Sequence, residues 1–219
     1  MQQLYNFAVG PLAWVAWAVF LGGSAWRLAS MWALARKKDM NAVAYMDVRH
    51  AARSMAHWAT PFATLGWRAN PAVTVATFAF HTALGLLLLF APGHAVLWDY
   101  AFGINVWSLP EGMADTLTVL VILLCGFFAW RRLQLPVVRF VTRPMDWLVL
   151  ALVAVPCVTA FLAKQQIGDN LLLSTLHVLS GEATLMALPF TRLSHAIFSP
   201  FTRAYMGSEF GGVRHCPDW

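Results

Sequence analysis

Five long apolar stretches constrain the fold of this chain more than any other feature of its sequence. The hydrocarbon core of a bilayer is about 30 Å thick, and a helix needs roughly 20 apolar residues to cross it. A helix also satisfies its own backbone hydrogen bonds where no water is present. The sequence therefore predicts an all-α integral membrane protein, a bundle of five transmembrane helices spanning about residues 7–26, 71–98, 114–130, 146–163 and 171–194.

The composition excludes a water-soluble protein of this length. Of the 219 residues, 59% are hydrophobic and only 11% are charged, whereas a soluble domain carries about 25% charged residues. The length fits a single membrane domain over residues 1–219. The first basic residue is Arg27, after the first apolar run, so this run is predicted to be a retained span and not a cleaved signal peptide.

The basic residues are distributed unevenly along the chain. All of the 15 Lys and Arg residues except Lys164 lie in the loop 27–70, in the loop after the third span, or from the end of the fifth span onward. Because cytoplasmic loops are enriched in Lys and Arg, we expect a periplasmic N-terminus and a cytoplasmic C-terminus in a bacterial inner membrane. The net charge of +5 thus indicates orientation, and no nucleic-acid partner is expected. Residues 41–58 of the first loop are predicted to form an amphipathic helix on the membrane surface.

Four histidines lie within the apolar spans: His81 and His94 on the second, His177 and His195 on the fifth. Ionisable side chains are costly at membrane depth, and imidazole is a common axial ligand of haem iron. His177 and His195 are 18 residues apart, which is five turns, so on one continuous helix they share a face about 27 Å apart. This spacing predicts two haems, one in each leaflet.

The direction of the spans predicts how these histidines pair. The second and fifth spans run antiparallel, so His81 is expected to pair with His195 and His94 with His177. His81 and His94 are 13 residues apart, which leaves them about 140° out of line on a straight helix. Pro92 interrupts that helix just before His94 and offers a way to re-aim its side chain.

For each of these histidines the alternative is a polar side chain tucked between helices and bonded to a carbonyl. That alternative is weaker for four histidines at two depths than for one. His50, His57 and His215 lie in cytoplasmic segments and are expected to be solvated or interfacial.

Other polar residues near the spans have two interpretations each. Arg192, one turn before His195, can pair with a haem propionate or extend to the interface. Glu182 is the only carboxylate deep in a span and can belong to a proton path or bond a neighbouring hydroxyl. Gly85 and Gly181 can make space for a porphyrin or for a neighbouring helix.

The cysteines show no metal-binding spacing. Cys125 and Cys157 lie in apolar runs, Cys216 lies in the tail, and neither CxxC nor CxxCH occurs. An iron–sulfur cluster held by this chain alone is therefore not expected, and the haems are expected to be non-covalent haem b.

The five spans, the histidines on the second and fifth, and the run PFTRLSH from Pro189 to His195 resemble the gamma subunit of respiratory nitrate reductase. That family is a di-haem membrane cytochrome b with a quinol site near its outer haem. The resemblance implies ligand roles for His177 and His195 at the family's 18-residue spacing, and for His81 on the second span. The family's other ligand on that span comes ten residues after the first, where this chain has Ala91, and His94 comes three residues later. This departure favours the related cytochrome b subunits of transmembrane redox complexes in sulfate reducers.

The expected function is electron transfer through two haems b as the membrane subunit of an oxidoreductase complex. On the resemblance, the chain exchanges electrons with menaquinone or a periplasmic multihaem cytochrome c. On the cytoplasmic side the expected partner is an iron–sulfur subunit, similar to heterodisulfide reductase or to the nitrate reductase beta subunit, alongside other membrane subunits. A quinone is expected beside His94, Asp99 and Tyr100. The alternative is a non-redox anchor or small transporter whose histidines line a proton or metal path, although five spans without a repeat fit a transporter poorly.

Overall fold

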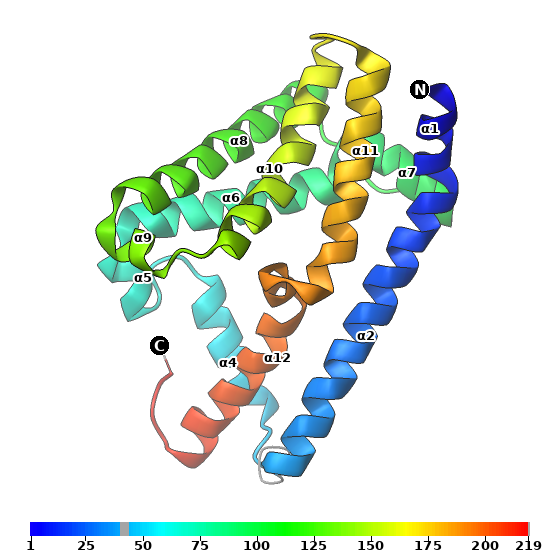
Figure 1. Cartoon of the computed structure of the whole chain (residues 1–219). Helices are drawn as coiled ribbons and strands as arrows, with labels where there is room; N and C mark the ends of the chain where they lie inside the picture. Colours follow the sequence, from blue (N-terminus) through cyan, green and yellow to red (C-terminus); the bar gives the residue numbers. More distant parts are fainter. Residues whose placement is uncertain (40–43, 219) are drawn as a thin grey trace. The chain divides into compact units, whose positions relative to one another are not determined.

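The computed structural model describes residues 1–39 and 44–218, which fold as helices with no β-strand among them (Figure 1). Five helical segments are long and apolar enough to cross a membrane: Gln2–Lys38, Pro71–Phe90, Glu111–Gln134, Pro144–Lys164 and Asn170–Phe190. In the most apolar 18-residue stretch of each segment, at most 22% is buried inside the protein. Such exposure of apolar helices is expected where lipid is the solvent. For the described residues, the prediction of an all-α fold with five helices able to span a membrane is confirmed.

The first span is one long helical segment. It consists of α1 (Gln2–Phe7), a π-type turn (Ala8–Leu12) and α2 (Ala13–Lys38). The turn contains Pro11, which lacks a backbone N–H and therefore interrupts the regular α-helical hydrogen bonding. The helix continues 12 residues past the predicted end at Trp26 and finishes on Arg36, Lys37 and Lys38, whose charges suit the negative end of the helix dipole.

The chain forms two compact units. The first consists of Met1–Val15 and Ala76–Leu185, and the second of Ala16–Val75 and Met186–Trp219. Each is described by itself below.

The first unit contains most of the apolar helices: α6 (Pro71–Phe90), α7 (Pro92–Phe102), α8 (Glu111–Gln134), α9 (Pro136–Val141), α10 (Pro144–Lys164) and α11 (Asn170–Ala187). Helices α8 and α10 pack side by side. Small and medium apolar residues form the buried core, namely Ala83, Leu87, Leu109, Ala114, Val121 and Cys125. Small side chains let membrane helices approach closely.

An ion-pair cluster joins the start of α8 to the end of α10. The Lys164 ammonium lies 2.8 Å from the Asp115 carboxylate and 3.8 Å from that of Glu111. Partly exposed pairs of this kind contribute about 0–1 kcal/mol each. They give a local role to the one basic residue outside the predicted cytoplasmic segments.

The second unit is organised around α4 (Val48–Ala59) and α12 (His195–Ser208), which pack tightly along their length. A Cβ on Gly207 would meet the Ser54 side chain and would lie 2.7 Å from the His50 carbonyl oxygen. Glycine is therefore required at position 207 for the two backbones to approach this closely. The short helix α5 (Leu65–Ala69) follows α4 in the same unit.

The C-terminal tail folds back onto this helix pair. The Asp218 carboxylate accepts a 2.6 Å hydrogen bond from the Ser54 hydroxyl and lies 3.6 Å from the Arg203 guanidinium. That guanidinium lies 4.4 Å from the centre of the Trp58 ring, a favourable cation–π contact.

Besides the end of the first span, three predicted boundaries are wrong. The second span ends at Phe90, because Pro92 starts the separate helix α7. The fifth span does not continue to Ser194, because its helix ends at Ala187 before Pro189. The predicted amphipathic helix 41–58 begins only at Val48, after the extended residue Asp47, and residues 41–43 lie outside the described part of the chain.

Candidate functional site

Two of the four predicted ligands face each other inside the first unit. His94 on α7 and His177 on α11 have ring centroids 6.1 Å apart and ring planes only 12° from parallel. Both side chains are partly buried. The structure thus brings together residues 83 positions apart in the sequence, as the pairing of His94 with His177 requires.

The separation of these rings suits a metal bound between them. Imidazole nitrogens bind metals at about 2 Å, so two imidazoles on opposite sides of one ion place their ring centroids roughly 6 Å apart. Aromatic rings in ordinary contact have centroids about 4.5–7 Å apart, a range that includes this spacing. The 6.1 Å spacing would allow His94 and His177 to hold one haem iron between them.

A broken helix positions His94. Helix α6 ends at Phe90, Ala91 is extended, and Pro92 opens α7. Because Pro92 has no N–H, the carbonyl of Leu88 loses its usual helical donor. The His94 Nδ1 fills this role, since it lies 3.1 Å from the Leu88 oxygen and 2.9 Å from that of Leu87.

The remaining carbonyls at the end of α6 also find donors. The Trp98 indole N–H bonds the Leu89 oxygen at 3.1 Å, and the Leu109 backbone N–H bonds the Phe90 oxygen at 2.8 Å. Unsatisfied carbonyls at a helix end are costly in a membrane. The turn between α6 and α7 is therefore fixed, and the direction of His94 is fixed with it.

A second proline positions His177. The His177 Nδ1 lies 2.9 Å from the carbonyl oxygen of Pro156, which sits inside α10. Two turns further along α11, the Thr184 hydroxyl bonds the Leu152 oxygen on α10 at 2.5 Å. Two side-chain bonds thus connect α11 to α10 on the side that carries His177.

These contacts fix the tautomer of both rings. A carbonyl oxygen only accepts hydrogen bonds, so Nδ1 of His94 and of His177 must carry the proton. The neutral ring then keeps a lone pair on Nε2. Metal-binding histidines nearly always donate their other ring N–H in this way.

The other predicted pair falls in different units. His81 lies on α6 in the first unit and is exposed, while His195 opens α12 in the second unit and is also exposed. The Nδ1 of His81 bonds the Thr77 carbonyl at 2.8 Å, and that of His195 bonds the Arg192 carbonyl at 2.7 Å. As for His94 and His177, the carbonyl acceptor means that Nδ1 carries the proton in both rings. The pairing of His81 with His195 stays a prediction.

His177 and His195 do not share one helix, contrary to the argument from their 18-residue spacing. The chain leaves α11 at Ala187, passes a 3-10 turn at Leu188–Phe190 and an extended residue at Thr191, and turns again before α12. Pro189 removes an N–H and crowds the preceding turn, which ends the helix. The predicted separation of 27 Å along a shared face therefore does not apply.

The residues predicted for a quinone site do not converge on His94. Asp99 and Tyr100 follow on α7 and are exposed, Tyr100 at 88%. At about 100° per residue they point away from the face that carries His94. The structure brings neither together with the paired imidazoles, and a quinone site at these residues stays a prediction.

Glu182 on α11 is buried, with 8% of its surface exposed. Neither of its carboxylate oxygens has a hydrogen-bond partner among the described residues. The prediction that it bonds a neighbouring Ser or Thr is therefore wrong for the part of the chain that the structure describes. Gly85 and Gly181 have open space where a Cβ would lie, so close packing does not require glycine at either position.

Within residues 1–39 and 44–218, no three His, Cys, Asp or Glu side chains gather as metal donors. A haem needs only two protein ligands to its iron, a number that a pair of imidazoles can supply. The three cysteines are free thiols, two in the first unit and Cys216 exposed in the tail.

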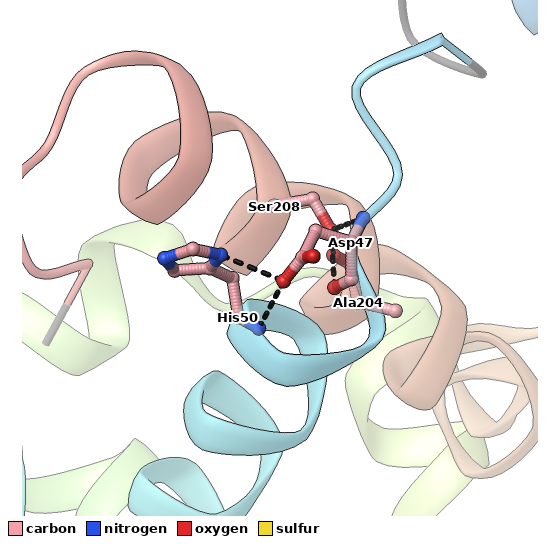
Figure 2. Close-up of polar contacts among 4 residues, drawn as sticks. All are labelled: Asp47, His50, Ala204 and Ser208. Atoms are coloured by element: carbon pink, nitrogen blue, oxygen red, sulfur yellow. Dashed lines mark hydrogen bonds and ion pairs between the residues drawn. The ribbon is translucent and has the colours of Figure 1, made fainter.

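His50 and His57 lie on α4 in the second unit, which also holds His195 at the start of α12. The His50 ring and backbone N–H both bond Asp47, while the Asp47 backbone N–H bonds the Ser208 hydroxyl (Figure 2). The His50 backbone N–H, followed by its side chain, holds the pKa of Asp47 below its ordinary value of 3.8. These contacts cap α4 and tie it to α12, which is a structural role.

A cavity of about 220 Å³ lies beside this region in the second unit, lined by Asp39, Tyr45, Tyr205, Ser208, Glu209, Val213 and Arg214. The Tyr205 hydroxyl donates a 2.6 Å hydrogen bond to the Asp39 carboxylate, which raises the pKa of Tyr205 to about 12. None of the residues predicted to bind haem or quinone is among those lining it.

Sequence reasoning missed the residues that bond the imidazoles or the carbonyls near them. Pro156, Thr184 and Trp98 carry no metal-binding signature, and their roles depend on which carbonyls they free or satisfy. Pro156 was a usable signal for such a contact, because a proline inside a helix always leaves one carbonyl without its helical donor. Here that carbonyl belongs to Leu152, four residues earlier.

Comparison with known proteins extends over the whole chain. No family model matches it. Over 225 aligned residues it is 38% identical to a protein of Nitratidesulfovibrio vulgaris (strain Hildenborough) whose name states no activity, and the alignment covers 98% of each chain. Identity at this level over the full length indicates common descent and a shared fold. The chain therefore belongs to the same family as this Nitratidesulfovibrio vulgaris protein.

Proposed function

We propose that the chain is a haem-binding cytochrome b subunit that carries electrons across a bacterial inner membrane. The observation that carries this proposal is the near-parallel pair of His94 and His177, with ring centroids 6.1 Å apart. The orientation of both Nδ1–H groups toward backbone carbonyls supports it, because each Nε2 is then left to bind iron. When bound, a haem supplies one-electron chemistry between its ferric and ferrous states.

The protein residues hold and insulate such a group. His94 and His177 would hold the haem iron from different helices, and the carbonyls of Leu87 and Pro156 orient their rings. The apolar helices exclude water and lower the local dielectric, which tunes a redox potential. His81 and His195 are proposed to hold a second haem in the cytoplasmic half, with Arg192 near a propionate.

The direction and partners of electron transfer follow from the predicted orientation. With its N-terminus in the periplasm, the chain would exchange electrons on that side with menaquinone or a multihaem cytochrome c. On the cytoplasmic side it would serve an iron–sulfur subunit docked on the basic loops. The resemblance to the nitrate reductase gamma subunit supports this arrangement, with the branch found in sulfate reducers favoured.

The test is the absorption spectrum of the purified protein after growth with ample haem. We expect a Soret band and a b-type α-band on reduction with dithionite. His94→Ala and His177→Ala should each weaken these bands, whereas His57→Ala, a histidine on α4 in the other unit, should leave them unchanged. A colourless protein would favour a non-redox anchor or transporter, and equal spectra in all variants would reject these ligands.

A further inference from the structure

Helix α11 is joined to α10 by two side-chain hydrogen bonds at separate points along both helices. His177 and Thr184 are seven residues apart, which is two turns, so both project from one face of α11. Their acceptors on α10 are the Pro156 and Leu152 carbonyls, four residues apart. Because two separate points are joined, the pair of bonds fixes both the rotation and the height of α11 against α10.

The acceptor used by Thr184 exists because of Pro156. A helical residue normally donates its N–H to the carbonyl four positions earlier, and Pro156 has no N–H to give to Leu152. In a membrane span no water replaces the missing donor. The Thr184 hydroxyl does so at 2.5 Å, although its single proton is shared with the Ser180 carbonyl of its own helix at 2.8 Å.

We propose that Thr184 is a positioning residue for His177. Its bond to Leu152 holds α11 at the register where the His177 Nδ1–H reaches the Pro156 carbonyl and the ring faces His94. The test by haem loss rests on the proposed function, since it takes His177 as a haem ligand. The test by the His177 hydrogen bond does not depend on haem.

Thr175 provides a matched control on the same helix. It is buried at 1% exposure, and its hydroxyl bonds the Leu171 carbonyl of α11 itself at 2.6 Å. Thr175→Val therefore removes a buried hydroxyl from α11 without breaking a link to α10. Thr184→Val removes the link, and Thr184→Ser keeps it.

The first measurement uses haem-free protein labelled with ¹⁵N-histidine in lipid nanodiscs. The His177 Nδ1–H resonance, assigned by its loss in His177→Gln, should be protected from exchange in the wild type, Thr184→Ser and Thr175→Val. In Thr184→Val it should shift and exchange faster with water. A resonance unchanged in Thr184→Val would overturn the proposal, whatever the protein does with haem.

The second measurement is the rate at which reconstituted haem is lost to excess apomyoglobin. Changes behind a metal-binding histidine weaken binding by about 10- to 100-fold. We expect Thr184→Val to speed loss of the His177-bound haem about 10-fold, with Thr184→Ser and Thr175→Val close to wild type. Equal rates in Thr184→Val and Thr175→Val would contradict a specific role for Thr184.

A double variant tests the link to proline. In Pro156→Ala, residue 156 regains an N–H for the Leu152 carbonyl, so Thr184 loses its special role. The effect of Thr184→Val should shrink in this background, which is a measurable coupling between neighbouring sites. Purely additive effects would contradict the mechanism. Haem absent from the wild type would reject the proposed function, and the ¹⁵N result would then decide the role of Thr184.

Discussion

At the scale of single residues, backbone carbonyls decide what each histidine can do. The spacing of polar groups in the apolar spans was enough to single out His81, His94, His177 and His195. It was not enough to show that Nδ1 of each donates to a carbonyl, because that depends on backbone geometry and on a neighbouring helix. A histidine bonded to a backbone carbonyl can also be a metal ligand, since a ligating ring uses its second nitrogen in this way.

Asp47 gives a pH-dependent prediction at this scale. Its native pKa lies below 3.8 because of the bonds from His50, so its contribution to stability is present above that pH. The contribution is lost as the pH falls through the lowered native pKa. Asp47→Asn keeps a helix-capping oxygen but cannot titrate. Its unfolding midpoint should vary less than that of the wild type between about pH 6 and pH 2, and an identical pH profile would show that Asp47 is not responsible.

At the scale of elements, the positions of helices were predictable and their interruptions were not. Apolar runs located all five spans, because crossing the bilayer demands them. The break at Ala91 and the end of α11 at Ala187 arise from Pro92 and Pro189, whose effect on direction depends on which donors replace the lost bonds. Where the predicted geometry assumed a straight helix, it failed.

The break before α7 can be removed with one substitution. Pro92→Ala restores an N–H at position 92, which favours continuing α6 through Ala91. On a continuous helix, His94 would lie about 140° around the axis from His81 and would point away from His177. We expect loss of the haem assigned to His94 and His177, measured as haem per chain. Full haem content in this variant would show that the break is not needed.

The contact between α4 and α12 gives a stability prediction with an internal control. In Gly207→Ala the new methyl group meets Ser54 and the His50 carbonyl, so the two helices must separate. Overpacking of this kind costs about 1–3 kcal/mol. In Gly212→Ala the nearest side-chain atom, on His50, is 3.8 Å away, which is ordinary contact. Denaturant unfolding in detergent should therefore show a loss of stability for Gly207→Ala alone, and similar losses in both variants would be inconsistent with the packing described.

At the scale of the whole molecule, charge predicts orientation in the membrane. Cys216 is exposed in the tail, whereas Cys125 and Cys157 lie within the spanning helices α8 and α10. A membrane-impermeant maleimide should label Cys216 in inverted vesicles and not in intact spheroplasts, because the distribution of basic residues predicts a cytoplasmic tail. Cys216→Ser should abolish the signal. Labelling in spheroplasts would reverse the orientation and the assignment of partners to the two sides.

The two predicted histidine pairs differ in how they are distributed between the two units. The pairing of His94 with His177 falls within one unit, where the structure tests their proximity. The pairing of His81 with His195 joins different units and relies on the direction of the spans alone.

The most direct measurement of the central claim is haem per chain, by pyridine haemochrome assay, in His94→Ala, His177→Ala and the double variant. If the two imidazoles serve one iron, each single variant loses the same haem and the double variant loses no more. The wild type should hold two haems, and all three variants should hold one. Wild-type protein without haem, or a double variant that loses twice as much as either single variant, would contradict the account.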